Sequence, residues 1–89
     1  MANLVITIKI MPEIEADLDE IKEDAVKKLK KLKAYIGKTE ITPVAFGLNS
    51  INITFTIDES VNSDDIENSI KNINGVQSIS ITDVRRAIG

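Results

Sequence analysis

Two segments of the chain alternate strictly between apolar and polar residues, and a chain with this pattern has to bury one face of a β-sheet. The first segment is LVITIKI (4–10) and the second is INITFTID (51–58). A period of two places successive side chains on opposite faces of a strand, so each segment is predicted to be a half-buried strand. The residues expected on the buried face are Leu4, Ile6, Ile8, Ile10, Ile51, Ile53, Phe55 and Ile57.

Between these two segments the apolar spacing changes to three and four residues, which is typical of an amphipathic helix. Asp17 is expected to cap this helix, with Glu20 three residues later as in a capping box. The lysine-rich run KKLKKLK (27–33) lies at the C-terminal end, where the helix dipole favours cations. We interpret this run as a solvated helix end, with a contact surface for acidic groups as the alternative. The apolar stripe consists of Ile14, Leu18, Ile21, Ala25, Leu29 and Leu32.

Two further segments have the composition of strands. AYIGKTEIT (34–42) is the weaker of them, and its Gly37 is expected to mark a β-bulge. VQSISITDV (76–84) is predicted to be the last strand, followed by a short tail, RRAIG (85–89).

A second helix is predicted between the strand at 51–58 and the last strand. Asn62 or Ser63 can cap it, and Asn74-Gly75 ends it, because glycine readily takes a positive φ. The element order is therefore βαββαβ, which predicts an α+β ferredoxin-like sandwich. Right-handed crossovers favour a four-stranded antiparallel sheet of order 4-1-3-2, with two helices on one face.

Length and composition exclude several classes of site. At 89 residues and 9.8 kDa, the chain is predicted to form a single domain, residues 1–89. It contains no Cys and no His. Disulfides, zinc-thiolate sites and thiol catalysis are excluded, and the commonest general base is missing. No catalytic residue, metal site or cofactor is expected.

Neither nucleic acid nor a membrane is an expected partner. The net charge is −3, and the outward positions of the two alternating strands carry Thr, Lys and Asn instead of the aromatic residues on which RNA-binding domains of this topology stack bases. No apolar run approaches the ~18 residues of a membrane span. The start, MANLVITIKI, lacks the basic region and cleavage site of a signal peptide. A soluble, cytoplasmic protein is expected.

The segment ITPVAFGLNS (41–50) is unusually apolar for the connection between two strands. Pro43 removes a hydrogen-bond donor, and Gly47 permits a backbone conformation that other residues resist. Phe46 lies between them and has two possible roles. It can fold back over the open end of the core, or it can be presented as the apolar anchor of a protein interface.

PVAFGL (43–48), followed at a distance by NGVQSISITDVRR (74–86), closely resembles the archaeal elongation factor 1-beta family. The resemblance covers essentially the whole chain, including the opening LVITIKIMPE. It implies a ferredoxin-like fold, cytoplasmic action in translation, and no covalent chemistry. Members promote release of GDP from elongation factor 1-alpha, the GTPase that delivers aminoacyl-tRNA to the ribosome. The chain is therefore expected to be a guanine nucleotide exchange factor with that GTPase as its partner.

The resemblance also suggests which residues bind the partner. Phe46 falls on an aromatic residue of the family's GFG-type loop, Gly47 matches, and Ala45 replaces the first glycine. In eukaryotic relatives this loop contacts the second domain of the GTPase, so the candidate contact residues are Pro43, Val44, Ala45, Phe46 and Gly47.

At the C-terminus, eukaryotic relatives present a lysine that enters the nucleotide and magnesium site. The end of this chain reads RRAIG and has no lysine. Arg85 and Arg86 are the nearest cations, with Asp83 beside them. The resemblance makes these three residues candidates for partner binding, whereas simple pairing of the arginines with Asp83 or the sheet rim is the alternative.

The predicted topology places the connection at 43–47 and the C-terminus at opposite ends of the sheet, separated by roughly 25 Å for strands of about eight residues. Such a molecule is expected to be a monomer when free. The alternative function is a ferredoxin-like regulatory module that binds a small ligand or oligomerises through its uncovered sheet face.

Overall fold

The computed structural model describes residues 2–87 and contains four strands and two helices in the predicted order. A short 3₁₀ turn connects the second and third strands. The elements are β1 (Asn3–Pro12), α1 (Leu18–Lys31), β2 (Tyr35–Pro43), η1 (Ala45–Gly47), β3 (Asn49–Asp58), α2 (Ser63–Lys71) and β4 (Val76–Arg86).

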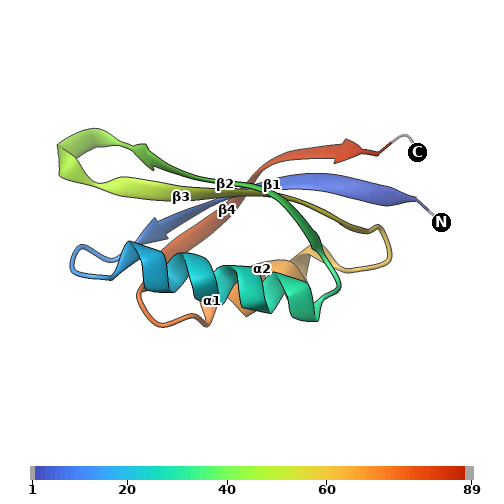
Figure 1. The fold of residues 1–89 in the computed structure, drawn as a ribbon, viewed down its shortest axis with the longest axis horizontal. Helices are drawn as coiled ribbons and strands as arrows, with labels where there is room; N and C mark the ends of the chain where they lie inside the picture. The colour runs from blue at the N-terminus through green and yellow to red at the C-terminus, as the bar shows by residue number, and fades with distance from the viewer. Residues whose placement is uncertain (1, 88–89) are drawn as a thin grey trace.

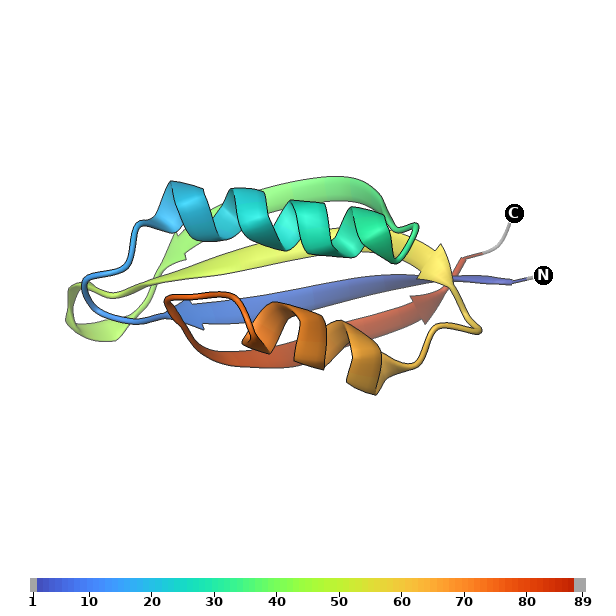
Figure 2. The ribbon, with the colours of Figure 1, turned by 90° about the horizontal axis from the view of Figure 1, so that it is seen from below.

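The four strands form one antiparallel sheet of order β2-β3-β1-β4. Read from the other edge, this is the predicted order 4-1-3-2, so the predicted topology is confirmed. Both helices cover the same face of the sheet, and no helix or strand of residues 2–87 covers the opposite face (Figures 1 and 2).

The core lies between the sheet and the helices. All but one of the residues predicted for the inner face of the two alternating strands are buried, and Leu4 packs against them at the margin. Phe55 is fully buried, which confirms its predicted inward orientation. The helices contribute Ile21, Leu29, Ile66 and Ile70, and Ile73 follows the end of α2.

Side-chain caps fix where both helices begin. Asp17 Oδ1 accepts hydrogen bonds from the backbone N–H groups of Asp19 and Glu20, at 3.0 and 3.2 Å. Asn62 Oδ1 accepts one from the N–H of Asp64 at 2.8 Å, so the cap of α2 is Asn62 rather than Ser63. Neither helix is both long and apolar enough to span a membrane, as judged over residues 2–87.

The structure corrects one predicted boundary. Arg85 and Arg86 were expected to begin a tail, but they are the last residues of β4 and pair with Val5 and Leu4 of β1. Strand β1 begins at Asn3 and offers pairing partners that are too distant in sequence to be apparent from the local pattern. Ala87 also donates its N–H to the carbonyl oxygen of Asn3 at 2.9 Å. The rest of the predicted tail, residues 88–89, lies outside the described part of the chain.

The molecule is an elongated wedge of 41 × 21 × 18 Å. The β2–β3 connection lies at one end of the long axis, and the start of β1 and the end of β4 lie together at the other end (Figure 1). The two regions predicted to contact a partner are therefore at opposite ends, as the topology requires.

Candidate functional site

The β2–β3 connection is a compact five-residue loop closed by backbone hydrogen bonds. The N–H of Val44 donates to the carbonyl oxygen of Leu48 at 2.7 Å, and the N–H of Leu48 donates to that of Ala45 at 3.3 Å. Pro43, the last residue of β2, pairs with Asn49, the first residue of β3. We call residues 43–48 the hairpin tip. Its backbone is held in place by the loop itself, without support from the helices.

Phe46 projects from the hairpin tip with 99% of its surface exposed. It does not fold over the core, so the exposed one of its two predicted positions is confirmed. Its backbone is left-handed, with φ 63° and ψ 34°, followed by Gly47 at φ 74°. A bulky residue in this conformation costs of order 1–3 kcal/mol, and such strain is concentrated at functional sites. The sequence indicated the glycine but gave no sign that Phe46 itself takes a positive φ.

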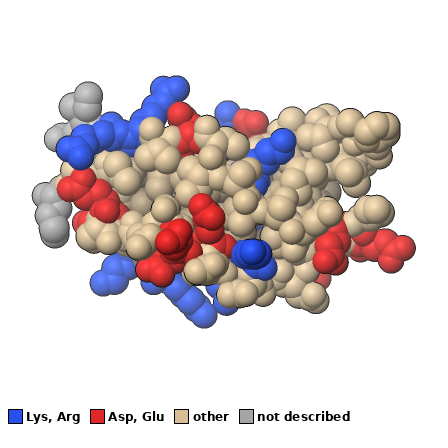
Figure 3. Space-filling view, turned by 180° about the vertical axis from the view of Figure 1, so that it is seen from behind, with Lys and Arg blue, Asp and Glu red and all other residues tan. Residues whose placement is uncertain are grey.

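The neighbours of Phe46 leave the ring without cover. Pro43 and Ala45 are exposed, while Val44 and Leu48 are half-buried. A side chain built on Gly47 would meet no atom within 4 Å. In Figure 3, this end of the molecule shows a mostly uncharged surface at the level of the hairpin. The hairpin tip is therefore an isolated apolar projection.

At the other end of the molecule both arginines form ion pairs. Arg85 Nε donates to Asp83 Oδ2 at 2.9 Å, and Arg86 Nη2 donates to Glu59 Oε2 at 3.2 Å. The predicted pairing of Arg85 with Asp83 is present, and Glu59 is a partner that the sequence did not indicate. All four side chains are largely exposed. The structure therefore brings Asp83 and Arg85 together, and it links Arg86 to the β3–α2 loop.

A turn near this end is stabilised by Asp58. Its Oδ1 accepts a hydrogen bond from the backbone N–H of Ser60 at 2.8 Å. This bond and a second one from the Ser60 side chain lower the pKa of the Asp58 carboxyl below its ordinary value of 3.8. The turn carries Glu59, so it determines where Arg86 finds its partner.

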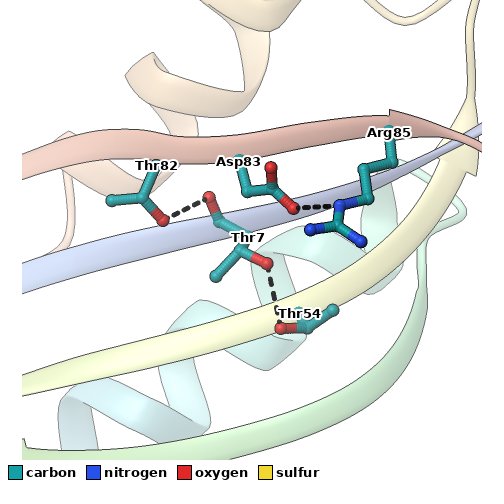
Figure 4. A network of polar contacts seen from close by, with 5 residues as sticks. All are labelled: Thr7, Thr54, Thr82, Asp83 and Arg85. Atoms are coloured by element: carbon teal, nitrogen blue, oxygen red, sulfur yellow. Dashed lines mark hydrogen bonds and ion pairs between the residues drawn. The ribbon is translucent and has the colours of Figure 1, made fainter.

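Polar side chains cover the face of the sheet that the helices leave uncovered. Thr7 and Thr54 share a hydrogen bond between their hydroxyl groups at 3.1 Å, and Thr82 Oγ1 donates to the carbonyl oxygen of Thr7 at 3.2 Å (Figure 4). We call this surface the open face. Strand pairing assigns to it Val5, Thr7, Lys9, Tyr35, Lys38, Glu40, Asn52, Thr54, Thr56, Ser80, Asp83 and Arg85.

The described surface also has hollows outside these regions. One of them, of about 370 Å³, lies between α1 and the α2–β4 turn and is lined by Lys27, Lys28 and Lys31 among others. Residues 2–87 contain no group of three or more His, Cys, Asp or Glu side chains placed to hold a metal ion. We call the end of β4 that carries Arg85 and Arg86 the arginine end. The hairpin tip, the open face and the arginine end are thus the surfaces with the most distinctive chemistry.

Solved structures of similar shape define the class as a ferredoxin-like α+β sandwich. The C-terminal domain of the MgtC protein from Mycobacterium tuberculosis has a TM-score of 0.72 at 6% identity, covering 94% of this chain and 87% of that one. The ACT domain from the GTP pyrophosphokinase of Chlorobium tepidum has a TM-score of 0.62 at 13% identity, covering 90% and 99%. At these identities the likeness shows the fold alone.

Sequence comparison identifies the family. Residues 5–87 match the EF-1 guanine nucleotide exchange domain, and the chain belongs to that family. It is 34% identical to elongation factor 1-beta of Methanothermobacter thermautotrophicus, covering 97% of this chain and 98% of that protein. It is 35% identical, with the same coverage, to elongation factor 1-beta of Methanobrevibacter smithii. Family membership supports a role as a nucleotide exchange factor in translation elongation.

Proposed function

We propose that the chain binds the translational GTPase elongation factor 1-alpha and promotes exchange of its GDP for GTP. The observation that carries this proposal is the full exposure of Phe46 on a strained, hydrogen-bonded hairpin. An aromatic side chain held rigidly in water gains much more from burial in a partner than a mobile one, because little conformational entropy remains to be lost. Family membership supplies the class of partner.

The hairpin tip is the proposed anchor. Pro43, Val44, Ala45 and Gly47 hold Phe46 away from the sheet, and the ring enters an apolar pocket of the GTPase. Burying an aromatic side chain removes 150–250 Å² from water, which is enough for a dominant contribution to binding.

The arginine end is the proposed second contact. Arg85 and Arg86 lie toward the opposite end of the 41 Å long axis from Phe46, and Asp83, which pairs with Thr7, lies nearer to the middle of the sheet. A rigid wedge that binds at both ends bridges two parts of the GTPase, and it favours the relative position of those parts in which both contacts form. That position is one in which the GDP phosphates and their magnesium ion are held less tightly.

The exchange requires no covalent step in this chain. By linkage, a factor that weakens GDP binding is itself weakened to the same extent by GDP. A thousandfold faster release of GDP corresponds to a reduction of about 4 kcal/mol in the activation free energy. One buried aromatic anchor and one lost phosphate or metal contact are sufficient for this amount.

The test is GDP release from the purified GTPase. The GTPase is loaded with a fluorescent GDP analogue, excess unlabelled GTP is added, and fluorescence is followed with and without this protein. We expect acceleration that saturates with protein concentration. An unchanged release rate would contradict the proposal. Sizing chromatography gives a second readout, in which the free protein elutes as a monomer and moves to larger size only when the nucleotide-free GTPase is present.

A further inference from the structure

The row of open-face residues nearest to the arginine end combines an aromatic ring with an arginine. Strand pairing links Tyr35 to Thr56, Thr56 to Val5, and Val5 to Arg85. Directly paired residues of an antiparallel sheet point to the same face. Adjacent strands lie about 4.8 Å apart, so the row spans roughly 14 Å from Tyr35 to Arg85.

A bulge in β2 is the reason that Tyr35 points outward. On either side of Gly37 the register shifts: Ile36 pairs with Phe55, whereas Lys38 pairs with Thr54. In a strand of the same sequence without a bulge, Tyr35 would share a face with Ile41, which pairs with the inward Ile51. Bulges commonly re-aim a side chain in this way. Tyr35, the first residue of β2, is consequently 77% exposed.

Both arginines form ion pairs, Arg85 with Asp83 and Arg86 with Glu59, and both side chains remain largely exposed. The bond to Asp83 involves only the Nε of Arg85. Its two terminal nitrogens have no hydrogen-bond partner within residues 2–87. Two parallel N–H groups of a guanidinium match a carboxylate in bidentate fashion. Asp83 therefore acts as the residue that orients Arg85.

We propose that the open face is the surface on which the GTPase lies, with Tyr35 as a second aromatic anchor and Arg85 as the partner of a carboxylate on the GTPase. This inference rests on the proposed function. Tyr and Arg are among the residues that contribute most to protein interfaces. Thr56 and Val5 between them are small and half-buried, so a partner can approach the backbone of the sheet closely.

The positions of the two proposed contacts indicate that the GTPase is the protein that covers the open face. The hairpin tip and Arg85 lie at opposite ends of the same sheet, and α1 and α2 cover the other face (Figures 1 and 2). A partner that contacts both ends therefore extends along the open face. A carboxylate of the GTPase is the proposed partner of Arg85, because the parallel N–H groups of a guanidinium match a carboxylate in bidentate fashion.

The test measures binding of the full chain to the GTPase, both nucleotide-free and GDP-loaded, by titration calorimetry. Tyr35→Ala is expected to weaken binding at least tenfold and Arg85→Gln at least fivefold, in both forms of the GTPase. Tyr35→Phe keeps the ring. Lys31→Gln changes an exposed residue of α1, which lies on the opposite side of the sheet from the open face. Both control variants are expected to bind within twofold of the parent.

Different outcomes separate this inference from the proposed function. If the parent neither binds the GTPase nor accelerates GDP release, the proposed function fails. If the parent does both and Tyr35→Ala behaves identically, only the open-face inference is overturned. A loss for Arg85→Gln that is confined to the GDP-loaded form would assign Arg85 to a phosphate and overturn the carboxylate contact.

A second measurement needs no variant and covers the case in which Tyr35→Ala folds poorly. Cross-saturation from the GTPase to the labelled unmodified chain reports which amides lie at the interface. We expect the amides of residues 5, 35, 56 and 85 to be saturated and those of α1 to be unaffected. Saturation of α1 instead would overturn the inference, as would a stable homodimer or an RNA complex that Tyr35→Ala abolishes while GTPase binding is unchanged.

Discussion

At the scale of single residues, the two phenylalanines have opposite environments. Phe55 is fully buried beneath the helices, whereas Phe46 is 99% exposed at φ 63°. Both the exposure and the backbone conformation of Phe46 are unfavourable in the isolated protein. Binding to a partner would bury the exposed ring. The strained backbone conformation is what directs the ring outward, toward such a partner.

Phe46→Ala and Phe55→Ala form a matched pair that tests this difference. We expect Phe46→Ala to change the free energy of unfolding by less than about 0.5 kcal/mol, since its ring touches little of the protein. The same variant is expected to weaken GTPase binding by about 2 kcal/mol or more. Phe55→Ala should destabilise the fold by about 3–5 kcal/mol. Urea unfolding and calorimetry measure the two quantities, and comparable destabilisation by both variants would contradict the assignment.

The sequence was informative about residues whose environment is decided locally. Strict alternation was sufficient to orient Phe55, and the caps at Asp17 and Asn62 follow from short-range hydrogen bonding. The positive φ of Phe46 was not predictable, because it depends on closure of the loop between Val44 and Leu48. The hydrogen bond of Arg86 to Glu59 depends on tertiary structure, since 27 positions separate the two residues.

At the scale of elements, the α2–β4 turn is closely packed against its neighbours, whereas the hairpin tip has open space around it. Gly75 has φ 94°, and a Cβ added to it would lie 3.1 Å from the Cβ of Ala16 and 3.2 Å from Cδ1 of Ile21. The N–H of Glu13 also donates to the carbonyl oxygen of Gly75 at 2.8 Å. This turn therefore joins the β1–α1 loop to the end of α2, and it requires glycine for both conformation and space.

Gly75→Ala and Gly47→Ala separate these two requirements. Both positions have a positive φ, so each variant should lose about 1 kcal/mol of stability from the backbone alone. Gly75→Ala should lose at least about 1 kcal/mol more, because the new methyl group is too close to Ala16 and Ile21. Thermal or urea unfolding measures the difference. Equal losses would show that the neighbouring loops move aside without cost.

The alternation of apolar and polar residues predicts two of the strands well and the other two poorly. The strands at 4–10 and 51–58 were predictable because one face is entirely apolar. In β2, nearly every residue is exposed and the bulge at Gly37 reverses the pattern, so the outward position of Tyr35 was not apparent from the sequence. The extension of β4 to Arg86 depends on pairing with the first residues of β1, which no local signal in TDVRR reveals.

At the scale of the whole molecule, the two proposed partner contacts lie far apart along the sheet. Energetic effects of substitutions more than 7–10 Å apart and without shared partners are usually additive within about 0.5 kcal/mol. Phe46 lies in the β2–β3 connection and Arg85 near the end of β4, toward opposite ends of a 41 Å molecule. The two ends are therefore expected to contribute to GTPase binding independently.

The double variant Phe46→Ala/Arg85→Gln tests this independence. Its loss in binding free energy should equal the sum of the losses of the two single variants within about 0.5 kcal/mol. Calorimetry on the parent, both single variants and the double variant closes the cycle. A double variant that binds no worse than Phe46→Ala alone would mean that Arg85 contacts the GTPase only after the hairpin has docked.

The pairing of Leu4 with Arg86 brings the first and last strands of the chain together at one extremity. Any reporter or immobilisation handle attached through either terminus is therefore carried next to Arg85 and remote from Phe46. Surface capture through such a handle would leave the aromatic hairpin accessible while crowding the arginines. A dye joined to an exposed residue of α1, such as Lys31, avoids both extremities and the open face.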